Sequence, residues 1–205
     1  MFLSDFVRDL TMEVPNLTDV QAMRALQRAA RRFYSETLLW EDRRSYQVGE
    51  GAFSFRLSLP IDECSVIAVK YVYFDGEELP LLRQTEFQSA SSLPSAPYPH
   101  GVMPSLPKES IFIAPPASIK QTGYEVVLVL APSMDADELP LDAYSQFEDA
   151  YIAGALSGLY SKGLFLNPAL ADVNEGRFSD FVTRAVNLRD GLYSGPAKVV
   201  GYGGL

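Results

Sequence analysis

Two groups of carboxylates have a spacing that could support acid–base or metal chemistry. Glu148 and Asp149 are adjacent, and a pair of carboxylates is what a glycosidase places around the bond it cleaves. Neighbouring helix positions point about 100° apart, so these two side chains cannot flank one bond. The second group, Asp135 with Asp137 and Glu138, lacks the glycine and the distal glutamate of an EF-hand calcium loop. We interpret it as a solvated acidic turn before a helix N-terminus, which favours negative charge.

Cys64 is the one cysteine of the chain and His100 the one histidine. A single cysteine excludes an intrachain disulfide and a cysteine metal cluster, and a single histidine excludes a multi-histidine site. His100 follows Ala-Pro-Tyr-Pro, a loop composition that offers no partner to tune it. The sequence has no phosphate loop, dinucleotide fingerprint or Gly-x-Ser-x-Gly elbow. We therefore expect a protein that is not an enzyme and that has no catalytic residue, metal or cofactor.

Four arginines, Arg24, Arg28, Arg31 and Arg32, recur at helical spacing on the flank of an apolar stripe. The simplest interpretation is a solvated helix face with local ion pairs, each contributing a few tenths of a kcal/mol. The second is a contact with an acidic surface of a neighbouring subunit. Direct DNA binding is a distant third, because of the overall charge.

The net charge of −9 is unevenly distributed. Residues 1–60 carry eight basic and eight acidic side chains, whereas residues 61–205 carry nine basic and eighteen acidic ones. Tight phosphate binding needs a dense cationic surface, so this composition argues against an ordinary nucleic-acid-binding protein. No run approaches the roughly 20 apolar residues of a membrane span, and the N-terminus lacks a secretory signal pattern. We expect a soluble protein that is made and used without secretion.

The apolar pattern predicts helices at both ends of the chain and strands between them. Residues 18–40 combine a capping box, Thr18 with Gln21, with a stripe of apolar residues that includes Val20 and Leu26. A shorter helix is expected before it, over residues 4–12. The predicted strands are 52–59, 65–74, 77–82, 110–114 and 124–130, with Asp75-Gly76 as a hairpin turn. Residues 89–107 hold five of the fourteen prolines and are expected to form a loop or a β-edge excursion.

Two further helices are predicted, over about residues 142–161 and from Asn167-Pro168 to about Leu188. Small residues three and four apart in the first of them let another helix approach closely. Two of these are glycines, which cost about 1 kcal/mol each against alanine in a helix, so a crowded contact is expected. The residues assigned to helix–helix packing are Ala150, Gly154, Gly158, Phe178 and Phe181.

These elements predict an α+β fold in which both ends of the chain form an antiparallel helical bundle around an inserted, mostly antiparallel β domain. The predicted parts are residues 1–44 with 136–190 for the bundle, 45–135 for the β domain and 191–205 for an extended C-terminal tail. Trp40, at the end of the first long helix, is interpreted as a packing anchor between the helical and β parts.

With these motifs placed, the chain resembles the head-to-tail adaptor proteins of tailed bacteriophages, in particular the tail-tubular-protein-A or gateway type of short-tailed phages. The resemblance rests on the helix of residues 26–40, on Arg44-Ser-Tyr-Gln-Val and on the hairpin of residues 72–79. It is most telling over residues 139–188, where a proline-led helix, an Asn-Pro corner and a final helix with a central phenylalanine follow one another. It covers most of the chain in architecture, and the family has no invariant catalytic residue to carry over.

The resemblance implies a structural virion protein, assembled in the host cytoplasm without a membrane. Such proteins form a ring, typically of twelve copies, that docks beneath the portal protein, joins the capsid to the tail tube or nozzle protein and encloses part of the channel for genome ejection. DNA passes through without specific binding, which suits an acidic chain. The C-terminal tail is expected to order on docking into the portal. The candidate subunit or portal contacts are Arg24, Arg28, Arg31, Arg32, Tyr193, Lys198, Val199, Tyr202 and Leu205.

Two alternatives remain at this point. The β part could be a ligand-binding module of a phage tail that holds a carbohydrate or a peptide, which saturable binding by residues 45–134 would reveal. A peptidoglycan hydrolase is the remote alternative. Some relatives have been credited with cell-wall-degrading activity, but no residues of this sequence support it.

Overall fold

The computed structural model describes residues 2–60, 63–94, 98–116, 121–139 and 145–193, which have the predicted α+β fold with antiparallel sheets. The α-helices are α1 (Val7–Glu13), α2 (Asp19–Thr37), α3 (Gln84–Ser91), α4 (Glu148–Tyr160) and α5 (Pro168–Tyr193). The strands are β1 (Glu41–Gly49), β2 (Ser54–Arg56), β3 (Cys64–Phe74), β4 (Glu77–Leu79), β5 (Gly101–Ser105), β6 (Ser110–Ala114) and β7 (Gln121–Pro132). Short 3-10 turns are η1 (Leu3–Phe6), η2 (Leu106–Lys108), η3 (Ser145–Phe147) and η4 (Gly163–Phe165).

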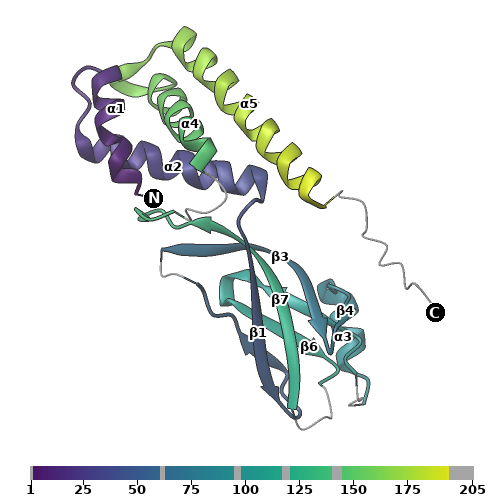
Figure 1. Cartoon of the computed structure of the whole chain (residues 1–205). Coiled ribbons are helices and arrows are strands. Elements are labelled where there is room, and N and C mark those ends of the chain that lie inside the picture. The colour runs from purple at the N-terminus through teal and green to yellow at the C-terminus, as the bar shows by residue number, and fades with distance from the viewer. Residues whose placement is uncertain (1, 61–62, 95–97, 117–120, 140–144, 194–205) are drawn as a thin grey trace, which may run out of the picture.

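Helices from both ends of the chain lie together. Figure 1 shows α1, α2, α4 and α5 at one end of the molecule and the strands at the other, with α3 beside the strands. α4 contacts α1, α2 and α5. The predicted domain boundary after residue 44 falls inside β1, and the one after residue 190 falls inside α5. None of the described helices is long and apolar enough to cross a membrane.

α2 begins with the predicted capping box. The Gln21 N–H donates to Thr18 Oγ1 at 3.3 Å, and the Thr18 N–H donates to Gln21 Oε1 at 3.1 Å, which satisfies amide groups that the first turn leaves free. Val20 was expected in the buried stripe but is 62% exposed. Steps of three residues carry Val20 about 120° around the helix from Leu26. The buried residues are Ala22, Leu26, Ala29, Ala30, Phe33, Tyr34 and Thr37.

β7 is an inner strand of the larger sheet, whose order is β1-β7-β3-β4. It pairs antiparallel with β1 on one side and with β3 on the other. Val126, Leu128 and Leu130 are fully buried, as the alternation of apolar residues predicted. Asp75 and Gly76 join β3 to β4 with φ values of 50° and 84°, which confirms the predicted hairpin turn.

The proline-rich residues 89–107 differ in part from the expected loop. Their first residues complete α3, which the sequence did not predict because Phe87 is the one large apolar side chain in that helix. Their last residues form β5, which pairs with β6 at the edge of the smaller sheet, of order β2-β6-β5. Pro104 has no N–H to donate and is accommodated in this edge strand. The β-edge interpretation is therefore right for β5.

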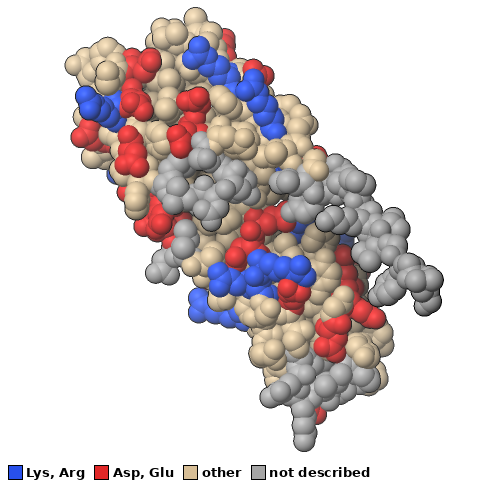
Figure 2. Space-filling model, viewed as in Figure 1, with Lys and Arg blue, Asp and Glu red and all other residues tan. Residues whose placement is uncertain are grey.

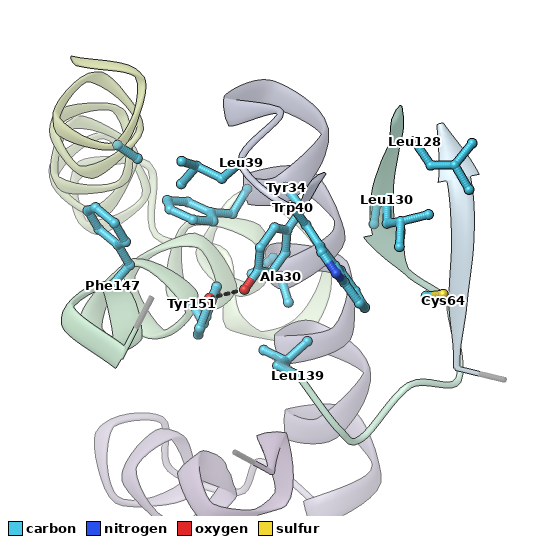
Figure 3. Packing of buried hydrophobic residues seen from close by; sticks show 14 of the residues in the cluster. Ala30, Tyr34, Leu39, Trp40, Cys64, Leu128, Leu130, Leu139, Phe147 and Tyr151 are labelled. Atoms are coloured by element: carbon cyan, nitrogen blue, oxygen red, sulfur yellow. Dashed lines mark hydrogen bonds between the residues drawn. The ribbon is translucent and has the colours of Figure 1, made fainter. Parts of the chain in front are cut away.

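One hydrophobic core continues from the helices into the larger sheet. Figure 3 shows Tyr34, Trp40 and Tyr151 packed among helical residues, with Leu130 of β7 nearby. Trp40 is buried, and its ring centroid lies 5.6 Å from that of Tyr34. Its carbonyl accepts a hydrogen bond from the Leu130 N–H at 2.8 Å. Trp40 therefore joins the helical and β parts, which confirms the predicted anchor.

Candidate functional site

The four arginines of α2 do not form one row. Arg24, Arg28 and Arg32 line a groove against α4, whereas Arg31 contacts the β part. Its Nη1 donates to the carbonyl of Pro132 at 2.8 Å and to Ser65 Oγ at 3.0 Å. Arg31 therefore ties α2 to β3 and β7 within one molecule, an internal role that helical spacing alone did not predict.

Arg32 is at the centre of a local ion-pair network between α2 and α5. Its guanidinium donates to Glu175 Oε2 at 2.8 Å and to Glu36 Oε1 at 2.7 Å, and it lies 4.4 Å from the centroid of the Phe178 ring. Ser157 Oγ donates to the same Glu175 oxygen at 2.9 Å. The hydrogen bonds from Arg32 and Ser157 hold the pKa of Glu175 below its ordinary value. Arg32 thus follows the simplest interpretation of the row.

The remaining arginines face open space. Arg24 and Arg28 are exposed, as is Lys162 after the end of α4. In the part of the chain that the structure describes, none of the three has an ion pair or a side-chain hydrogen bond. They are therefore cations available to a partner.

These cations border a groove of about 520 Å³ between α2, α4 and the first turns of α5, which we call the α2–α4 groove. Its apolar and small lining residues are Ala25, Ala29, Gly154, Ala155, Gly158, Leu159 and Phe165. Glu175 and Glu36 offset the charge of Arg32, so Arg24, Arg28 and Lys162 leave an excess of positive charge. An apolar floor with arginines along its rim suits a surface that presents carboxylates, because arginine–carboxylate hydrogen bonds are charge-assisted.

Gly154 and Gly158 have different surroundings. A Cβ atom on Gly154 would lie 2.8 Å from Cδ2 of Phe178 and 3.0 Å from Cβ of Ala29, so α2, α4 and α5 meet there as predicted. A Cβ atom on Gly158 would meet nothing within 4 Å. The expectation of a crowded contact at Gly158 is therefore wrong, because the groove separates α2 from α4 at that level.

A second hollow, of about 400 Å³, lies on the other side of α4, against α1 and α5. Its lining residues are Glu13, Asp149, Ile152, Ala153, Leu156, Asn174, Arg177 and Phe181. Ile152 and Gly154 point about 200° apart on α4, so the two hollows occupy opposite sides of this helix. Of the remaining residues assigned to packing, Ala150 is fully buried and Phe181 partly buried.

Two acidic side chains, Glu13 and Asp149, line this second hollow, and two more precede Glu13 in the chain. Asp5, Asp9 and Glu13 follow one another at steps of four along η1 and α1, and Asp149 belongs to the first turn of α4. All four are exposed, and Figure 2 shows acidic groups gathered over α1. We call these four residues the acidic face. Their spacing resembles any solvated helix surface, so the sequence alone did not mark them as a site.

The sequence predicted that the acidic turn of residues 135–138 is solvated. In the structure this turn is instead part of a hydrogen-bonded junction. The Asp137 carboxylate accepts hydrogen bonds from the Ser4 N–H at 2.8 Å and from Ser4 Oγ at 3.0 Å. Glu63 Oε2 accepts the N–H groups of Asp137 and Glu138 at 2.7 and 3.0 Å, which holds the pKa of Glu63 below its ordinary value. Among the described residues, no group of three or more His, Cys, Asp or Glu side chains is placed to hold a metal.

Most of the candidate tail contacts cannot be placed on this surface. Tyr193 is the last residue of α5. Lys198, Val199, Tyr202 and Leu205 lie outside the described residues.

The chain matches no protein-family model and no curated protein. What it does therefore has to be inferred from its own surfaces.

Proposed function

We propose that this chain is a non-enzymatic virion protein, a subunit of the head-to-tail adaptor of a tailed bacteriophage. Copies of it form a ring that docks beneath the portal protein, continues toward the tail tube or nozzle protein and encloses part of the DNA channel. The observation that carries the proposal is an exposed apolar corner between α4 and α5, at the end of the helical part farthest from the strands (Figure 1).

The apolar corner consists of Leu164, Leu166, Leu170 and Val173, which are 93%, 61%, 41% and 53% exposed. A group of large exposed apolar side chains is the kind of surface feature that marks protein–protein interaction sites. The corner is held in place by Asn167, whose side-chain oxygen accepts the Leu170 N–H at 3.3 Å at the start of α5. A rigid apolar projection suits docking to a preformed site, because little conformational entropy is lost on binding.

The architecture and the charge support the same role. Both ends of the chain contribute helices to one part, with the strands inserted between them, which is the organisation expected from the resemblance to adaptor proteins. The net charge of −9 is suited to a channel wall, because a cationic wall would bind the phosphates of DNA and slow its passage.

The apolar corner can be tested by portal docking. We expect the double substitution Leu164→Ser with Leu166→Ser to weaken binding to the portal protein of the same virus by at least about tenfold. The reason is that the two apolar side chains that docking would bury are then absent. Both residues are exposed, so the thermal unfolding midpoint should stay unchanged. Binding is measured by biolayer interferometry with immobilised portal.

Phe53→Ser is the matched control, because Phe53 is 72% exposed and lies in the β part. It should bind portal like the wild-type chain. If the corner variant binds portal with the affinity of the wild-type chain, the apolar corner is not the portal-binding surface. A wild-type chain with no affinity for portal would overturn the proposed function itself.

A further inference from the structure

We propose that copies of this chain join head to tail, with the acidic face of one copy seated in the α2–α4 groove of the next. The inference rests on the proposed function, since it names the contact that would close the adaptor ring. Its occupant is a second copy of this chain, and the argument comes from charge and from the placement of the two surfaces.

The α2–α4 groove carries positive charge that the chain itself leaves uncompensated. Arg24 and Arg28 are one helical turn apart on the exposed side of α2, and Lys162 follows α4 on the opposite bank. None of the three has an ion-pair partner among the described residues. The chain has a net charge of −9, so an excess of positive charge on one of its surfaces is unusual. A partner that presents carboxylates complements this surface best.

The acidic face supplies the complement. Asp5, Asp9 and Glu13 form a row on η1 and α1, and Asp149 adds a fourth carboxylate across the second hollow. Arg177 is the one basic residue among those that line this hollow. No ion pair involving Glu13 or Asp149 occurs within the described residues. Both surfaces therefore keep their charge available for another molecule.

The placement of the surfaces decides the symmetry. The groove and the acidic face lie on opposite sides of α4, so one copy cannot satisfy both of its own surfaces. A two-fold dimer would have to pair the groove of each copy with the acidic face of the other in one interface. That requires both surfaces on the same side of the molecule, whereas here they line hollows on opposite sides of α4. A contact between unlike patches leaves one groove and one acidic face free at the ends, and it closes only as a ring. Arg32 remains tied to Glu175 at the end of the groove and does not take part.

Two charge-reversed variants test the contact. The groove variant carries Arg24→Glu with Arg28→Glu, and the face variant carries Glu13→Arg with Asp149→Arg. Each variant alone would oppose like charges at every contact, so we expect assembly on portal to weaken at least about tenfold. Mixed in equal amounts, the two variants restore opposite charges at every contact and should assemble with alternating copies. All four positions are exposed, so each variant should fold. Mass photometry in the presence of portal measures the assembled mass.

Arg83→Glu with Lys108→Glu is the control, because it shifts the net charge as much as the groove variant but at exposed positions of the β part. It should assemble like the wild-type chain. Undiminished assembly of the groove variant, or loss in both variants without recovery on mixing, would overturn the head-to-tail contact and leave the adaptor role standing. A wild-type chain that stays monomeric with portal would overturn both proposals.

Discussion

The two glycines of α4 provide a matched test of how closely the helices pack. Gly154 and Gly158 are one turn apart in the same helix, and alanine at either position should gain about 1 kcal/mol of helix propensity. At Gly158 the added methyl group meets nothing within 4 Å. Gly158→Ala should therefore be stabilising by about 0.5–1 kcal/mol.

At Gly154 the same methyl group has no room. It would lie 2.8 and 2.9 Å from two ring carbons of Phe178 and 3.0 Å from Cβ of Ala29. Phe178 is fully buried and is covered by the Arg32 guanidinium, so its ring cannot move freely. Overpacking of this kind costs about 1–3 kcal/mol, which exceeds the gain in propensity. Gly154→Ala should be destabilising by about 1 kcal/mol.

Urea unfolding followed by circular dichroism measures both variants, and an unchanged slope would show that the unfolded states are comparable. For a chain of this size, 1 kcal/mol corresponds to a shift of about 2–4 °C in the unfolding midpoint. Phe178→Leu should reduce the cost of Gly154→Ala, because the two substitutions share one contact. Equal stabilisation by the two alanine substitutions would refute the close approach of α4 to α5 at Gly154.

Three further perturbations probe the contacts around the groove and the junction. Glu175→Gln should lower stability by about 0.5–1 kcal/mol, because Arg32 loses its charged partner on α5, and the loss should shrink in 1 M salt; an equal loss at both salt concentrations would contradict the ion pair. Because the pKa of Glu63 is lowered in the folded state, its carboxylate stabilises the fold at pH values above 4.5, the ordinary pKa of a glutamate. This contribution disappears as the pH falls through the lower pKa of the folded state. Glu63→Gln should therefore flatten the acid side of the stability-against-pH curve, and an unaltered curve would rule out the bond to Asp137. Arg31→Met should lower the free energy of unfolding by about 1–2 kcal/mol, since the hydrogen bonds from α2 to the strands are lost; thermal unfolding at the wild-type midpoint would exclude that tie.

Local signals in the sequence predicted much of the fold. The capping box of Thr18 and Gln21 and the Asp75-Gly76 turn depend on neighbours within a few residues, so their residue types were enough. The alternation along β7 likewise reports burial on a pleated strand. α3 gave no such signal, because a short exposed helix needs no apolar stripe.

The candidate site depends on distances between helices, which no local pattern encodes. Arg24 and Arg31 both belong to the series of arginines at helical spacing on α2. Arg24 nevertheless faces the open groove, whereas Arg31 hydrogen-bonds to the strands. Gly154 and Gly158 are equivalent in sequence but differ in crowding, because Phe178 and Ala29 pack against α4 at Gly154 and nothing does so at Gly158. The ion pair of Arg32 with Glu175 joins residues 143 positions apart. Only the packing of α2, α4 and α5 distinguishes these cases.

Electron microscopy of the full chain mixed with the portal protein of the same virus tests the adaptor role most directly. The proposal predicts an additional ring on one end of the portal, built from copies of this chain. The apolar corner variant should leave that end bare. Portal particles that stay unchanged in the presence of an excess of the wild-type chain would contradict the adaptor role.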